Sequence, residues 1–214
     1  MKLILSTVQR EDIDLLVLGH HGGGGLKRLF FGSPAEELLS LASCPVLTVG
    51  VDSPALANNA SGFRTILYVA DVHDSAHMAF PYALALAEEC RAKLVLVRVL
   101  SPHSVLDIGP GAFGPQEYAP EGLTDWRTRA REREMQRLKA LVPANHKLAS
   151  EPEYVVERAF ASDGILAAAS SCSADLVVIE ATKSRLPRLA SHLPGEWVHE
   201  VICHAKCPVL TVRN

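Results

Sequence analysis

A run of glycines near the start of the chain has the composition and spacing of a phosphate-binding loop. Its key residues are Gly19, Gly22, Gly32 and Ser33. Glycine has no Cβ, so the backbone can turn there and come close to a ligand. Ser33 stands just before Pro34, where a helix is expected to begin, and a helix N-terminus attracts phosphate through its free N–H groups and partial positive charge. The segment therefore predicts a phosphate site between a buried strand at residues 15–18 and that helix.

A purely structural interpretation of the same segment stays open. Ser33 and Glu36 have the spacing of a capping box, so the serine can cap the helix without any ligand. Glu36 and Glu37 also place negative charge in the first turn, which opposes a phosphate there. Lys27 and Arg28 supply positive charge to the loop, although long basic side chains are also commonly solvated.

The chain contains an internal repeat. Cys44-Pro-Val-Leu-Thr-Val49 recurs as Cys207-Pro-Val-Leu-Thr-Val212, and Asp14-Leu-Leu-Val-Leu18 matches Asp175-Leu-Val-Val-Ile179. The repeated unit covers residues 1–50 and again about 162–214, whereas residues 63–161 have no counterpart. The sequence thus predicts a partial domain at 1–50, a linker at 51–62 and a complete domain at 63–214.

Alternating strand and helix patterns run through the longer unit. Apolar, β-rich runs predict strands at 64–70, 93–100, 153–157, 176–180 and 209–212. Helical spacing predicts helices at 75–92, 123–142, 163–173 and 194–204. Met78, Tyr82 and Leu86 follow the helical spacing of the first of these, in which Pro81 requires a late start or a bend. The side chains of Trp126, Ala130, Leu138 and Leu141 are expected to face the core. This alternation predicts an α/β fold, a doubly wound parallel sheet of five strands, with the partial copy added.

The partial copy is too small to form a core by itself, because it supplies only two strands and two helices. We therefore expect it to pack on the second domain or on another chain. The repeated Pro-Val-Leu-Thr-Val strands at residues 45–49 and 208–212 are apolar and carry no blocking charge. They predict a homodimer, or a pseudo-dimer within one chain, formed through these last strands.

The stretch from Asp14 through Gly19, Gly22, Gly32 and Ser33 to Val49 resembles the C-terminal half of a universal stress protein domain. That family carries a Gly-x₂-Gly-x₉-Gly-Ser/Thr signature for ATP phosphates, and these four residues match it. Residues 63–214 resemble the family over their whole length. The resemblance implies that Asp71, which ends the first strand of that unit, contacts the adenosine of a nucleotide, and that Val99 lies against the adenine.

The second copy departs from the family pattern at the phosphate loop. Glu180, Lys183 and Glu196 replace the residues that correspond to Gly19, Gly22 and Ser33, and only Gly195 remains. Two carboxylates where phosphates belong are repulsive, on the order of 1 kcal/mol each or more. The phosphate loop and the adenosine side therefore stand in different copies. Three arrangements stay open: a start further upstream than Met1, a separate chain that supplies the missing half, or a loop that binds a smaller anion alone.

Other residue sets are explained without a ligand. His73, Asp74 and His77 are typical of a polar turn, and Cys207 repeats Cys44, which has no metal-binding neighbours. A second set of possible metal ligands consists of Cys207 with His199, Cys203 and His204. Cys203, however, lies on an apolar helix face and is expected in the core. We therefore expect no metal. No serine or cysteine nucleophile stands beside a base, so the sequence does not indicate an enzyme.

The composition and net charge exclude several classes of protein. The 214 residues carry 21 basic and 24 acidic side chains, a net charge of −3 that indicates no nucleic-acid partner. No apolar run is long enough for a membrane span or a secretory signal. Five cysteines, an odd number, favour a reducing cytoplasm. We expect a cytoplasmic stress-response module that binds ATP or another adenine nucleotide. A dimerisation scaffold without nucleotide and a slow ATP hydrolase are the alternatives.

Overall fold

The computed structural model describes residues 2–20, 38–39, 41–50, 62–70, 77–101, 120–181 and 196–213. Its elements in chain order are α1 (Lys2–Arg10), β1 (Leu16–His20), β2 (Val46–Gly50), β3 (Thr65–Val69), α4 (Phe80–Cys90), β4 (Lys93–Leu100), α5 (Pro120–Leu141), β5 (Glu153–Arg158), α6 (Ala161–Ser171), β6 (Leu176–Ala181), α7 (Glu196–His204) and β7 (Val209–Arg213). Strands and helices alternate from β3 onward, as predicted, because short β-branched runs alternate with longer segments of helical spacing.

The strands form one sheet of seven in the order β1-β2-β7-β6-β3-β4-β5. The last five of these strands are mutually parallel. They make up the doubly wound sheet that the sequence predicts for the longer unit. β1 and β2 are parallel to each other and extend this sheet by two strands.

β2 joins the two parts by pairing antiparallel with β7. Val46 lies opposite Thr211, Leu47 opposite Leu210, and Thr48 opposite Val209. The expectation that the partial copy packs on the rest of the chain through the repeated strands is therefore confirmed. Without this pairing, β2 and β7 would each be an exposed edge strand, and the pairing covers both edges.

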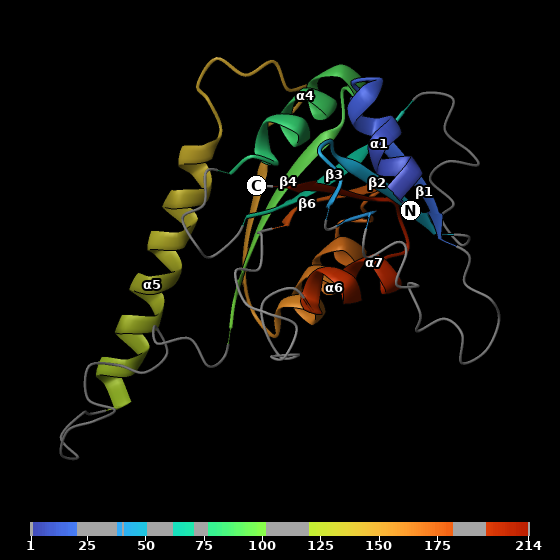
Figure 1. Ribbon diagram of the computed structural model, residues 1–214. Coiled ribbons are helices and arrows are strands. Elements are labelled where there is room, and N and C mark those ends of the chain that lie inside the picture. The colour runs from blue at the N-terminus through green and yellow to red at the C-terminus, as the bar shows by residue number, and fades with distance from the viewer. Residues whose placement is uncertain are drawn as a thin grey trace.

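Helices cover both faces of the sheet, with α4 above it and α6 and α7 below it in the view of Figure 1. One buried cluster joins α4 and α5 to alternate residues of the central strands; it includes Tyr68 of β3, Leu96 of β4 and Leu138 of α5. The other joins α6 and α7 to the intervening strand residues; it includes Val97 of β4, Ile165 of α6 and Val201 of α7. This strict alternation along each strand is what places a given side chain above or below the sheet.

α4 differs in detail from the sequence prediction. It begins at Phe80 rather than at 75, with Pro81 in its first turn, so the late start is confirmed and the bend is not needed. Its buried residues are Phe80, Ala83 and Ala87, whereas Met78 and Tyr82 are exposed. Leu86, which shares the helical spacing of Met78 and Tyr82, is partly buried against the core.

α5 also differs in part from the sequence prediction, because one of its buried residues is charged. Ala130 and Leu138 are buried and Leu141 is partly buried, as predicted, while the side chain of Trp126 lies outside the described residues. Glu134 is buried as well, although it is a charged residue in a helix with many exposed charges. Its carboxylate meets the buried Arg98 of β4, with 2.7 Å between Nε and Oε2. The ion pair ties α5 to the sheet.

Candidate functional site

Gly19 lies in β1, next to the last residue of that strand, and stands opposite Val49 of β2. It is exposed, and a Cβ built on it would meet nothing within 4 Å. Among the described residues, none fills the space beside Gly19. Gly22, Gly32 and Ser33, the remaining residues of the predicted phosphate loop, lie outside the described residues.

A buried glutamate occupies the corresponding position in the second copy. Glu180 of β6 stands where the first copy has Gly19, and it is only 2% exposed, between β3 and β7 of the same sheet. Its neighbour in register is Val212. A buried carboxylate at the end of the strand repels an anionic ligand. Lys183 and Gly195 lie outside the described residues, and Glu196 is the first residue of α7.

Val99, the predicted adenine contact, lies near the end of β4 and is 7% exposed. Its side chain faces α6, where Gly164 lets the helix come close: a Cβ on Gly164 would lie 2.7 Å from Cγ1 of Val99. Val99 is thus a packing residue beneath α6 in this structure. Asp71 lies outside the described residues, two positions after the end of β3.

Gly19 and Val99, the described residues of the two predicted half-sites, lie on strands that are far apart in the sheet. Five strand-to-strand steps separate β1 from β4, which amounts to about 24 Å at the usual spacing of neighbouring strands. The antiparallel β2–β7 pair also turns the carboxyl ends of β1 and β2 toward the opposite end of the sheet from those of β3 and β4. Gly19 and Val99 therefore belong to separate places.

The cysteine and histidine residues of the second metal-like set lie on or just after α7. Cys203 Sγ is 3.5 Å from Nε2 of His199, and the ring Nδ1 of His204 is 2.9 Å from the carbonyl oxygen of Glu200. Burial raises the pKa of the Cys207 thiol to about 12, so this cysteine stays protonated. Burial also raises the pKa of its counterpart Cys44. Within the described part of the chain, no group of three or more potential ligands gathers at one point.

Asp175 is a residue whose role the sequence reasoning missed. It stands just before β6, and its Oδ2 accepts hydrogen bonds from the backbone N–H groups of Arg64, at 2.9 Å, and Thr65, at 3.0 Å. It thereby holds the start of β3 beside β6. The signal was available, because Asp14 occupies the same position before β1 in the internal repeat.

The fold and the paired copies define a chain of the universal stress protein class. The model of the universal stress protein family matches residues 2–50 and 62–213. The chain belongs to the universal stress protein family. A curated universal stress protein from Methanocaldococcus jannaschii is 41% identical over 46 residues, which are 22% of this chain and 27% of that protein.

Solved structures show the same fold. A functionally unknown protein from Pseudomonas aeruginosa PAO1 matches 99% of this chain and 67% of its own, with 18% identity and a TM-score of 0.65. A universal stress protein from Archaeoglobus fulgidus matches 100% of this chain and 64% of its own, with 15% identity and a TM-score of 0.61. The chain therefore spans about two thirds of the length of these structures.

Among the described helices, none is both long enough and apolar enough to cross a membrane. The five cysteines are all free thiols.

Proposed function

We propose that this chain is a cytoplasmic, nucleotide-linked regulatory or protective module of the stress response. Its phosphate side is the loop of Gly19, Gly22, Gly32 and Ser33, and its adenosine-side residues, Asp71 and Val99, belong to the other copy. We propose the corresponding division into a partial domain at 1–50, a linker at 51–62 and a complete domain at 63–214. The ligand is ATP or another adenine nucleotide.

The observation that carries the proposal is the contrast between Gly19 and Glu180. These two residues occupy the same position in the repeat, at the end of the strand that in the first copy leads into the proposed phosphate loop. Gly19 has open space where a side chain would be, whereas Glu180 puts a buried carboxylate there. This contrast favours the first copy as the one that accepts an anion. Because Val99 lies on β4, five strand steps from β1, the phosphates supply most of the binding energy in this chain.

Titration calorimetry with ATP and with inorganic tripolyphosphate tests the proposal. Both ligands are expected to bind with similar affinity, while adenosine binds at least tenfold more weakly. The double variant Gly32→Glu and Ser33→Glu is expected to abolish binding by placing two carboxylates in the loop. Gly195→Glu, at the corresponding position of the second copy, is the matched control and leaves binding unchanged. Absence of binding at millimolar ATP, or an unchanged affinity in the loop variant, contradicts the proposal.

The second candidate function is a dimerisation scaffold that binds no nucleotide. The observation in its favour is the β2–β7 pair, in which the two copies already associate through their repeated strands. A chain that binds neither ATP nor tripolyphosphate, yet keeps its fold, supports this candidate. The third alternative, a slow ATP hydrolase, requires a group that positions water, and no described residue is assigned to that role.

A further inference from the structure

The last turns of α7 bring a thiol and an imidazole together. Cys203 Sγ lies 3.5 Å from Nε2 of His199, and both side chains are partly buried. Residues four apart lie on the same side of a helix, so the helix itself produces this contact. A ring nitrogen within hydrogen-bond reach can take the proton of the thiol and leave a thiolate, which is the nucleophilic form of cysteine.

The internal repeat separates this pair from the residues that the fold requires. Cys207 recurs in the first copy as Cys44, and both cysteines are buried. In the same alignment, the first copy has Glu36 and Ser40 at the two positions of the pair. The thiol and the imidazole therefore belong to the complete copy alone, and the packing that the two copies share does not account for them.

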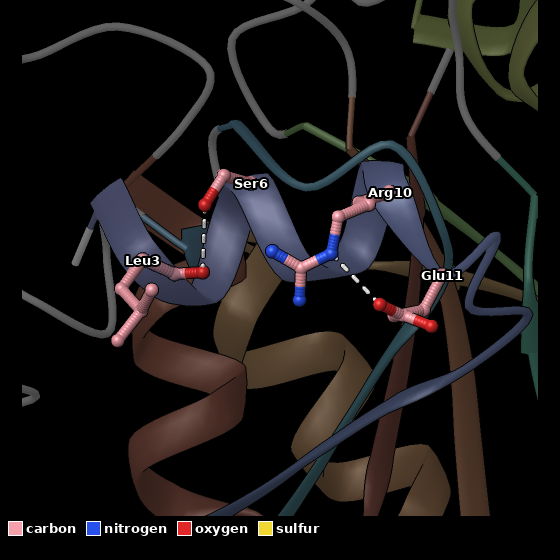
Figure 2. A network of polar contacts seen from close by, with 4 residues as sticks. All are labelled: Leu3, Ser6, Arg10 and Glu11. Carbon is pink, nitrogen blue, oxygen red and sulfur yellow. Dashed lines mark hydrogen bonds and ion pairs between the residues drawn. The ribbon is translucent and has the colours of Figure 1, made fainter.

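Cys172, at the end of α6, is a second cysteine without a counterpart in the first copy. The residue at the corresponding position is Glu11, which Figure 2 shows just after α1, paired with the Arg10 guanidinium at 2.7 Å. Cys172 donates its thiol hydrogen to the backbone carbonyl of Ala169 at 3.7 Å, and burial raises the pKa of this thiol. Cys172 thus keeps its proton. Because it packs against the same apolar cluster as Cys203, it serves as an internal comparison.

The other three cysteines are also less suited to reaction. Burial raises the pKa of the Cys44 thiol, and it raises that of Cys207 to about 12. Cys90, in the last turn of α4, packs against the opposite apolar cluster. Gly62 approaches it so closely that a Cβ there would lie 3.0 Å from Sγ of Cys90. Partial exposure and a proton acceptor thus come together at Cys203.

The place of Cys203 within α7 makes the imidazole decisive. α7 ends at His204, and the partial negative charge of a helix C-terminus opposes a lone thiolate in the last turn. The same charge favours a protonated imidazole, so thiolate and imidazolium are best formed together, as an ion pair. His204 is engaged elsewhere, because its Nδ1 lies 2.9 Å from the backbone carbonyl oxygen of Glu200. His199 is therefore the group that activates the thiol.

We propose that Cys203 is a site of reversible S-thiolation by low-molecular-weight disulfides, with His199 as its base. His199 takes the proton of the thiol, and the sulfur of Cys203 attacks one sulfur of the disulfide. The new S–S bond forms as the old one breaks, and the departing thiolate takes the proton from the imidazolium. Cys203 is oxidised to a mixed disulfide, the other half of the reagent is reduced to a thiol, and His199 returns to its neutral form.

The partial burial of Cys203 decides the size of the reagent. Its side chain packs against the apolar cluster beneath α6 and α7, so a small disulfide can reach the sulfur more easily than a cysteine on a folded protein. The inference goes beyond the proposed function and does not rest on it, because no nucleotide takes part in the reaction.

Reaction of the reduced chain with glutathione disulfide at pH 7 tests the proposal. Mass spectrometry of the digested protein measures the rate at each cysteine, and Cys203 is expected to react at least about tenfold faster than Cys172. His199→Gln is expected to slow Cys203 by about tenfold or more and to leave Cys172 unchanged. His204→Gln, in the same turn as Cys203, is the matched control and leaves both rates within about twofold.

Two further measurements separate a base from a merely structural residue. The ultraviolet absorbance of the thiolate at pH 7 is expected to fall in His199→Gln to the level of Cys203→Ser. Free imidazole is expected to restore part of the Cys203 rate in His199→Ala, in which the ring has left space beside the sulfur.

Each outcome decides the proposal. Equal rates at Cys203 and Cys172 in the original chain overturn it, and this comparison needs no substitution and hence no variant that folds. An unchanged Cys203 rate in His199→Gln overturns the role of the imidazole. Oxidation of Cys203 by hydrogen peroxide without any mixed disulfide overturns the assigned class of reagent.

Discussion

Leu47 of β2 lies opposite Leu210 of β7, and each residue is the other's counterpart in the internal repeat. The pairs on either side are exchanged by the same symmetry, since Val46 faces Thr211 and Thr48 faces Val209. The two copies thus meet about a local two-fold axis, as two subunits of a symmetric dimer do. Within one chain, this contact merges a two-stranded piece and a five-stranded sheet into one structure.

The same symmetry leaves two buried hydroxyl groups beside the axis. Within the part of the chain that the structure describes, the Oγ1 atoms of Thr48 and Thr211 have no hydrogen-bond partner. Because a buried hydroxyl without a partner costs free energy, Thr48→Val and Thr211→Val are each expected to raise the free energy of unfolding by about 1 kcal/mol. Urea denaturation measures this, with Thr65→Val, which is only partly buried, as a control within about 0.5 kcal/mol of the original chain. A loss of stability in both variants contradicts the prediction.

The strand pattern and the repeat predicted most of the fold. The range 93–100 for β4 was predicted as found, and the repeated Pro-Val-Leu-Thr-Val sequence predicted the β2–β7 contact. Both succeed because burial on two faces requires continuous apolar strands. The sequence did not predict the buried residues of α4, because two of them, Ala83 and Ala87, are small and stand out less in an apolar pattern than Met78 and Tyr82, which are exposed.

Only those parts of the candidate site that depend on residues close together in the sequence could be predicted. The position of Gly19 follows from the strand that contains it. The packing of Val99 on Gly164 does not, because it joins residues far apart in sequence. For the same reason the distance between the two half-sites could not be predicted: it depends on the antiparallel β2–β7 contact, which reverses the direction of β1 relative to β4.

The buried ion pair between Arg98 and Glu134 is expected to be costly to break from one side. Both side chains are almost fully buried, and Glu134 also accepts a hydrogen bond from Arg137 at 2.9 Å. Glu134→Gln removes the negative charge beside the buried Arg98, so the free energy of unfolding is expected to fall by about 3 kcal/mol. Glu132→Gln, an exposed position on the same helix, is the control and changes it by less than about 0.5 kcal/mol. Equal effects of the two variants in urea denaturation would show that the pair has no such role.

The close approach of α6 to β4 is expected to depend on Gly164. Gly164→Ala places a methyl group 2.7 Å from Cγ1 of Val99 and 3.1 Å from Cβ of Ala159. This overpacking is expected to lower the free energy of unfolding by about 1–3 kcal/mol, and Val99→Ala in the same chain restores part of it. Gly19→Ala, where a Cβ meets nothing, is the control and leaves stability unchanged. Additive effects of Gly164→Ala and Val99→Ala in a double-mutant cycle contradict the assigned contact.

The ionisation of the Cys207 thiol is expected to make the free energy of unfolding depend on pH in the alkaline range. Burial raises its pKa from 9.0 to about 12, with smaller contributions from Asp175 and Cys172. Above pH 9 the thiol ionises in the unfolded chain but not in the folded one, so proton release favours unfolding. The stabilisation is thus complete below pH 9 and is lost as the pH rises toward 12. At pH 10 the loss is expected to be about 1 kcal/mol. Denaturation curves at pH 8 and pH 10 measure it against Cys207→Ala, in which this part of the pH dependence is absent. Identical losses in the two chains would mean that other groups account for the whole effect.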